Sequence, residues 1–164
     1  MKIIALTVLV NALIFSRFFC NSVERISMSQ TPSTDPIRSR RELDSLVLYE
    51  KEKQGIPNVR IDIEQSRSAP DYIVKSTIPL GAPEGTKILA VVGKTGNNTY
   101  KISFFGDTIY ASEVRHEIYH IASGFADLEY RKNHGGLKPW ELWAYPQQQH
   151  NEEKAAIRYE LQGK

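Results

Sequence analysis

The spacing of apolar residues predicts a first helix between Asp35 and Gly55. An apolar stripe recurs there at three- and four-residue intervals, the period of one helix face, and its members are Leu43, Leu46, Val47 and Tyr49. Asp35 is a suitable N-cap, and Pro36 suits the first helical turn. Gly55 and Pro57 predict the end of the helix.

The pattern then changes to the two-residue period of β-strands. Residues 59–63 alternate apolar and polar side chains, and residues 72–74 form a second strand candidate. The nearly continuous apolar run 87–92 predicts a central strand, because such strands are buried on both faces. Turn-forming residues at 96–98 then predict a hairpin that leads into a further strand at 99–105.

A second amphipathic helix is predicted directly after this strand. Uncharged residues give it a face suited to partial burial: Val114, Ile118, Tyr119, Ile121 and Ala122. Thr108 or Ser112 can cap its start, and Gly124 can end it in a left-handed turn. With a last helix near the C-terminus, these elements predict an α+β fold. It consists of a small twisted mixed β-sheet, an N-terminal helix and two further helices.

The second helix contains His116-Glu117-Ile118-Tyr119-His120, an H-E-x-x-H motif. Residues four apart lie on one helix face, so both imidazoles can bind one tetrahedral Zn²⁺. Glu117 follows the first histidine and can act as general base toward a water molecule on the metal. The motif therefore predicts a zinc metallohydrolase, in the first place a peptidase. The alternative is a surface helix that carries two unrelated histidines.

A catalytic zinc site needs a third protein ligand and an open position for water. The metzincin arrangement requires a glycine and a ligand where this chain has Ser123 and Ala126. Asp127 would serve only after a shift of one residue. A helix opened by Asn151 offers better candidates in its first turn, Glu152 and Glu153.

We choose Glu152 over Glu153 because the helix face of Glu152 carries no further charge. Positions three, four and seven residues after Glu152 are Ala155, Ala156 and Tyr159. The corresponding set for Glu153 includes Glu160, which predicts a more solvated face. The predicted metal ligands are thus His116, His120 and Glu152. Two solvated glutamates favoured by the helix dipole remain the alternative.

The motif, followed on another helix by Asn151-Glu152, resembles the arrangement of gluzincins, in which a glutamate is the third zinc ligand. The Glu-Glu-Lys-Ala run at 152–155 and the small size are similar to ImmA/IrrE-like minimal metallopeptidases. The resemblance covers about residues 99–161. Gluzincins often have an aspartate four residues after the ligand, where this chain has Ala156, so another group must orient the zinc histidine.

Peptide hydrolysis also needs a hydrogen-bond donor to the oxyanion. The candidates are His134, His150, Tyr119 and Tyr145, and we choose His134 because it lies in the glycine-containing stretch 133–136. Trp140, Trp143 and Tyr145 are expected to pack in the core between the two metal-bearing helices. The expected partner is a protein or peptide substrate of a monomeric enzyme. The alternative function is an exported zinc-binding or interaction module without turnover.

Composition and the N-terminal segment set the cellular context. The chain has 164 residues, a net charge of +2 and one cysteine, Cys20. This composition predicts one domain at 35–164, no disulfide framework and no nucleic-acid binding. Lys2 and the apolar stretch that follows predict a signal peptide or N-terminal anchor at 1–20, joined by a flexible linker at 21–34. We expect export by cleavage near 20–23, anchoring through this segment alone, or lipidation of Cys20.

Overall fold

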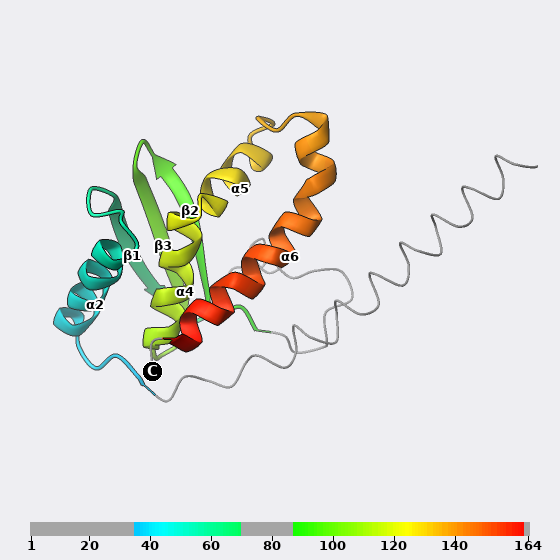
Figure 1. Cartoon of the computed structure of the whole chain (residues 1–164). Coiled ribbons are helices and arrows are strands. Elements are labelled where there is room, and N and C mark those ends of the chain that lie inside the picture. The colour runs from blue at the N-terminus through cyan, green and yellow to red at the C-terminus, as the bar shows by residue number, and fades with distance from the viewer. Residues whose placement is uncertain (1–34, 70–86, 163–164) are drawn as a thin grey trace, which may run out of the picture.

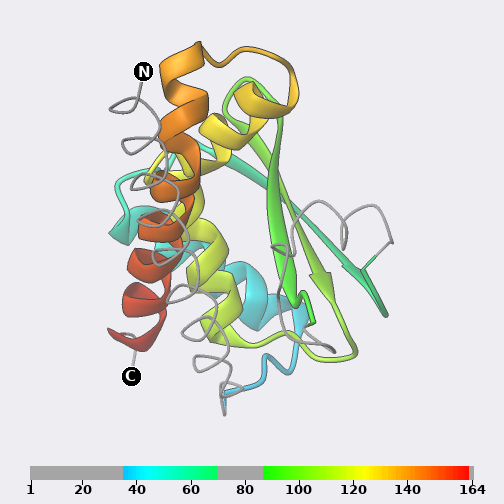
Figure 2. The same cartoon turned by 90° about the vertical axis from the view of Figure 1, so that its right-hand side faces the viewer.

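The computed structural model describes residues 35–69 and 87–162, and it has the predicted α+β architecture (Figure 1). The elements in chain order are α2 (Arg40–Lys53), β1 (Arg60–Ser66), β2 (Ala90–Gly96), β3 (Thr99–Phe105), α4 (Ala111–Ala122), α5 (Phe125–Asn133) and α6 (Pro139–Gln162). Figure 2 shows these helices on one side of the sheet. Segments 1–20 and 21–34 and the strand candidate 72–74 lie outside the described residues. Within the described ranges, no helix has the length and apolar character needed to cross a membrane.

Helix α2 begins later than the sequence predicts. Its N-cap is Ser39, whose hydroxyl accepts a hydrogen bond from the Glu42 amide at 3.2 Å. The predicted cap and first-turn residues, Asp35 and Pro36, instead belong to an extended segment in which Pro36 forms an antiparallel bridge with Tyr110. This pairing holds the chain before α2 against the residues that lead into α4.

The buried face of α2 also differs from the predicted stripe. Leu43 and Val47 are buried as predicted, but the third buried position is Glu50, not Tyr49, which is 58% exposed. Spacings of four and three residues keep Glu50 on the same helix face as Leu43 and Val47, whereas Tyr49 is rotated about 100° away from Glu50. The helix ends before Gly55, whose φ of 72° explains the predicted stop.

The sheet is mixed, with strand order β1-β3-β2. Strand β3 pairs in parallel with β1 and antiparallel with β2, so that Ile63, Ile102 and Val92 lie in register. The predicted hairpin between β2 and β3 is confirmed, and Asn98 takes a φ of 52° in its turn. The central position predicted for 87–92 is wrong: β3 is central and β2 lies at an edge among the described strands. The burial of the strands agrees with this order, because side chains of β3 are buried whereas those of β2 are intermediate or exposed.

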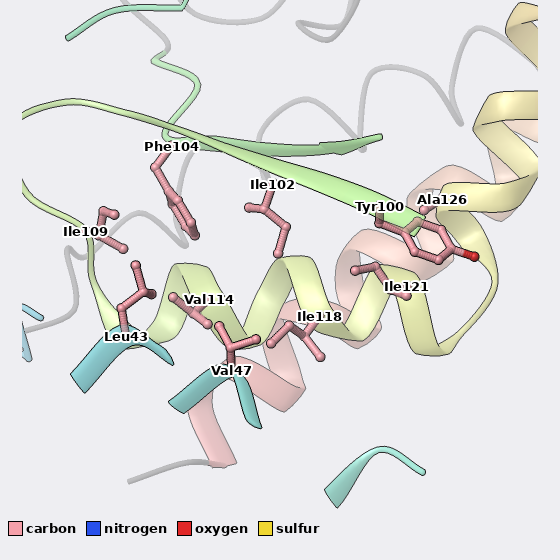
Figure 3. Close-up of a cluster of buried hydrophobic side chains, with 10 residues drawn as sticks. All are labelled: Leu43, Val47, Tyr100, Ile102, Phe104, Ile109, Val114, Ile118, Ile121 and Ala126. Carbon is pink, nitrogen blue, oxygen red and sulfur yellow. The ribbon is translucent and has the colours of Figure 1, made fainter. Parts of the chain in front are cut away.

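One hydrophobic core fills the space between β3 and the helices (Figure 3). Ile102 of β3 and Val114 and Ile118 of α4 are completely buried. Leu43 and Val47 close the core on the α2 side. One face of α4 is therefore fixed to the sheet, and its opposite side is left to meet α6.

Helix α6 is longer than predicted. The sequence places its start at Asn151, but the helix begins at Pro139 and continues through Pro146. Asn151 is therefore an interior residue and accepts a side-chain hydrogen bond from Gln147 at 3.0 Å. The second half of α6 lies beside α4 (Figures 1 and 2), which brings the two predicted metal-bearing helices together.

Candidate metal centre

Helix α4 places the motif by fixing both of its ends. At the start, the Glu113 carboxylate accepts a hydrogen bond from the amide of the N-cap residue Tyr110 at 3.1 Å, so neither Thr108 nor Ser112 is the cap. At the end, Gly124 takes a φ of 80°, the left-handed conformation that the sequence predicts. Between these ends, the apolar face packs on the sheet and His116 and His120 point toward α6.

The structure brings His116, His120 and Glu153 together. The two Nε2 atoms are 3.1 Å apart. One Glu153 oxygen lies 3.4 Å from the Nε2 of His116, and the other lies 3.4 Å from the Nε2 of His120. Among the described residues, these three form the one group of at least three His, Cys, Asp or Glu side chains close enough to share a metal ion.

These separations can be compared with those of a metal-bound site. Ligand atoms at about 2.0–2.1 Å from a tetrahedral zinc ion lie about 3.3 Å from one another. The separations here join the two imidazole nitrogens to each other and each nitrogen to a different oxygen of Glu153, and each is within about 0.2 Å of that value. Two imidazoles and one carboxylate are also the donor types that zinc binds in catalytic sites. The donor set and its spacing therefore fit a single divalent cation.

Glu152, the ligand chosen from the sequence, lies outside this cluster. The carboxylate between the two imidazoles belongs to Glu153, and one buried oxygen of Glu152 has no hydrogen-bond partner. The choice between the two glutamates is therefore reversed. Ala156, three residues after Glu153, is completely buried and allows α6 to approach α4 closely.

Glu160 explains why the choice from the sequence failed. It lies two helical turns after Glu153 on the same face, and its carboxylate is 3.3 Å from the Nδ1 of His116. The charge of Glu160 suggested from the sequence that the Glu153 face of the helix is solvated. In the structure, the same carboxylate lies against His116 and orients its ring. Gluzincins often use an aspartate to orient a zinc histidine, and this chain has Ala156 at that position. Glu160 is placed to orient His116 instead.

Electrostatics in this cluster favour a His116–Glu153 ion pair in the absence of metal. Burial lowers the pKa of His116, but hydrogen bonds with Glu153 and Glu160 outweigh burial and raise the pKa to about 10. Burial raises the pKa of Glu153, but hydrogen bonds with His116 and His120 outweigh it and hold that pKa well below its usual range. The proton retained by His116 thus lies between the same groups that would hold a cation.

Two further groups on α4 differ from this paired cluster. Glu117 is 6% exposed, and burial raises the pKa of its carboxyl group above the usual range, while the neighbouring His116 and His120 lower it. The Nδ1 of His120 is buried without a hydrogen-bond partner. Glu117 is therefore a buried acid beside the donor set, and the ring of His120 is positioned by packing against Phe125 at 5.2 Å between centroids.

The other predicted site residues lie elsewhere. His134 is exposed at the C-terminus of α5, where its Nδ1 is 2.8 Å from the Tyr130 carbonyl and its ring stacks on Tyr130. The prediction that His134 lies over the metal site is therefore wrong, because its contacts with Tyr130 hold it at the C-terminal end of α5. Asp127 accepts hydrogen bonds from Tyr100 and Lys94 at 2.7 and 3.0 Å and is not part of the cluster.

The aromatic group predicted to fill the core divides into two parts. Tyr145 is buried, stacks on Phe125 and donates a hydrogen bond to Glu129 at 2.8 Å. Trp140 and Trp143 are 62% and 86% exposed, so the prediction that they pack between the helices is wrong. They lie on the part of α6 that precedes its contact with α4.

A second polar cluster, which the sequence did not predict, joins α2, α4 and α6. Glu50 is 1% exposed and accepts hydrogen bonds from Arg115 at 3.2 Å and from Tyr159 at 2.5 Å. Each partner comes from a different helix. The one signal in the sequence is the position of Glu50 on the apolar face of α2.

Comparison of the chain with protein-family models, curated proteins and solved structures finds no significant match. The geometry of the His116–His120–Glu153 cluster is therefore the main observation that bears on function.

Proposed function

We propose that this protein is a zinc-dependent metallopeptidase whose metal ligands are His116, His120 and Glu153. The observation that carries the proposal is the convergence of two imidazole nitrogens, 3.1 Å apart, with the Glu153 carboxylate, which has one oxygen 3.4 Å from each nitrogen. These separations are close to the distance between neighbouring ligands of a tetrahedral zinc ion. His116 and His120 come from one helix and Glu153 from another. The α4–α6 packing therefore determines the site.

A bound zinc ion would supply Lewis acidity, which acidifies a water ligand and polarises a peptide carbonyl. The chain supplies the proton transfers. Glu117 takes the proton of the attacking water on a carboxylate oxygen and passes it to the leaving nitrogen of the peptide. Its burial supports this role, because a raised pKa makes the carboxylate a stronger base than one in water.

Glu160 serves as a positioning residue. By accepting a hydrogen bond from the Nδ1 of His116, it directs the Nε2 of that ring toward Glu153 and His120. Glu153 is 40% exposed on its side chain, so solvent reaches the donor set from that side. Water can approach there, which a catalytic site requires and a closed structural site does not.

The test combines metal analysis with a proteolysis assay on a peptide library. Wild-type protein is expected to bind one zinc ion and to lose activity with a chelator. Glu117→Gln should keep the metal and lose about 10²–10⁴-fold in rate. Glu153→Gln should lose metal, and Glu152→Gln is the matched control that should retain it. Loss of zinc in Glu152→Gln but not in Glu153→Gln would contradict the ligand assignment.

The second candidate is a metal-free ion-pair cluster that joins α4 to α6. The raised pKa of His116 and the lowered pKa of Glu153 favour it, because these groups satisfy each other without a cation. It predicts no zinc in the purified protein and no effect of zinc on thermal unfolding. An exported module that binds zinc without turnover would take up the metal but show equal, background hydrolysis in wild type and Glu117→Gln.

A further inference from the structure

The corner between α5 and the first half of α6 exposes an unusual amount of apolar surface. Trp143 is 86% exposed, Trp140 62%, Leu142 49% and Tyr130 40%. Four of the eight large exposed hydrophobic residues in the described part of the chain therefore lie within fourteen positions. We call the group formed by Tyr130, Trp140, Leu142 and Trp143 the aromatic corner.

The helical phase of α6 explains why these side chains face solvent. Glu141 and Tyr145, four residues apart, point back toward α5: Glu141 pairs with Arg131 at 3.0 Å, and Tyr145 donates a hydrogen bond to Glu129. With this inner face occupied by polar contacts, Trp140, Leu142 and Trp143 are directed outward. Figure 1 shows this part of α6, in orange, extending past the end of the sheet.

Basic residues outnumber acidic residues around the exposed aromatic residues. The stretch 129–145 contains three basic residues, Arg131, Lys132 and Lys138, and two acidic residues, Glu129 and Glu141. Glu129 accepts the hydrogen bond of Tyr145. Glu141 is already engaged, because it pairs with Arg131 and accepts a hydrogen bond from the Lys138 amide at 2.8 Å. The ammonium group of Lys138 lies over the Trp140 ring at 5.0 Å, and that of Lys132 lies over the Tyr145 ring at 3.9 Å. Neither lysine is paired with a carboxylate in a described ion pair.

We propose that the aromatic corner is a docking surface for an anionic lipid membrane. Tryptophan with flanking lysine is the combination that settles at the boundary between headgroups and acyl chains. Tryptophan and tyrosine are enriched at protein–protein interfaces as well, but lysine is depleted there, so the two lysines are what favours lipid over a protein partner. A surface of this kind holds the domain against the membrane in one orientation, with the N-terminal part of α6 inserted. This inference is independent of the metal site.

Tryptophan fluorescence provides a direct test, because Trp140 and Trp143 are the two tryptophans of the chain. The full chain is titrated with vesicles of phosphatidylcholine alone and of phosphatidylcholine with phosphatidylglycerol. We expect a blue shift of the emission with the anionic vesicles, quenching by bromine-labelled acyl chains, and loss of both effects in high salt. Because emission reports on this corner alone, vesicle attachment through residues 1–20 does not mimic the signal.

Two sets of variants sharpen the test. Lys132→Gln with Lys138→Gln should raise the lipid concentration at half-maximal shift about fivefold per lysine. The matched control, Lys51→Gln with Lys154→Gln, removes the same charge elsewhere and should change nothing. An unshifted emission with anionic vesicles overturns the proposal, as does an equal shift with neutral vesicles. A shift that depends on protein concentration without lipid would assign the surface to self-association and would also overturn it.

Discussion

Two polar clusters lie along the contact between α4 and its neighbouring helices, and they differ in how completely their groups are paired. Around Glu50, one carboxylate accepts hydrogen bonds from Arg115 and Tyr159, one on each of its oxygens. Around His116 and His120, two imidazole nitrogens and the two oxygens of Glu153 converge with separations of 3.1–3.4 Å, and a buried nitrogen of His120 has no partner. The first cluster has the properties of a structural connection, and the second has those of a binding site.

This difference shows why burial alone does not identify function. Glu50 is the more deeply buried glutamate, yet each of its two oxygens already accepts a hydrogen bond, one from Arg115 and one from Tyr159. Glu153 is partly exposed and shares its two oxygens between two imidazoles. In the proposed function, a cation would take the place of the proton in the second cluster.

The largest stability effect is expected at Glu50. Glu50→Ala leaves Arg115, whose side chain is 16% exposed, without its partner and should lower the free energy of unfolding by about 3–5 kcal/mol. Urea denaturation of the metal-free protein measures this loss. Asp44→Ala, which breaks the exposed Arg40–Asp44 pair, is the control and should cost less than about 1 kcal/mol. Equal losses in the two variants would contradict a structural role for Glu50.

Zinc should stabilise the second cluster and not the first. At a free zinc concentration about 1,000 times the dissociation constant, linkage predicts an increase of about 4 kcal/mol in the free energy of unfolding. The increase should vanish in Glu153→Gln and persist in Tyr159→Phe, which alters the Glu50 cluster alone. Thermal unfolding with and without zinc is the measurement, and a zinc effect that survives in Glu153→Gln would exclude Glu153 as a ligand.

A smaller effect is expected at Glu160. Glu160→Gln should weaken zinc binding about 10–100-fold, because the Nδ1 of His116 loses a charged acceptor but both rings remain in place. Competition with a metal-binding dye measures the affinity. The comparison variant is Glu152→Gln on the same helix, whose affinity should equal that of the wild type.

The stability of the metal-free protein should also depend on pH. The folded pKa of His116 is raised to about 10, so its contribution to stability is complete below about pH 6.5 and is lost as pH rises toward 10. The pKa of Glu153 is lowered, so its contribution is present above its unfolded pKa of about 4.3 and is lost as pH falls below that value. Urea unfolding in chelator should therefore show a maximum between these limits. In His116→Gln the loss on the alkaline side should disappear, and an unchanged profile would argue against the ion pair.

Local sequence patterns predicted most of the secondary structure. The two-residue period identified β1, the Gly96-Asn97-Asn98 turn predicted the β2–β3 hairpin, and Gly124 marked the end of α4. The errors concern choices that local patterns cannot make. Tyr49 and Glu50 are neighbours in sequence, and only the partners supplied by α4 and α6 bring the charged residue inward. Likewise, Pro36 is typical of a first helical turn, but its pairing with Tyr110 places it in an extended segment.

The sequence by itself determined the α+β class and the placement of His116 and His120 on one helix face, because both follow from the fixed rotation between successive residues of a helix. Only the tertiary structure decided that Glu153, and not Glu152, meets them and that Glu160 supports His116. That decision depends on the rotation of α6 about its own axis, which is set by its packing against α4. Adjacent residues on a helix differ by about 100° in direction, so the carboxylate that faces the histidines is fixed by contacts between residues far apart in the chain.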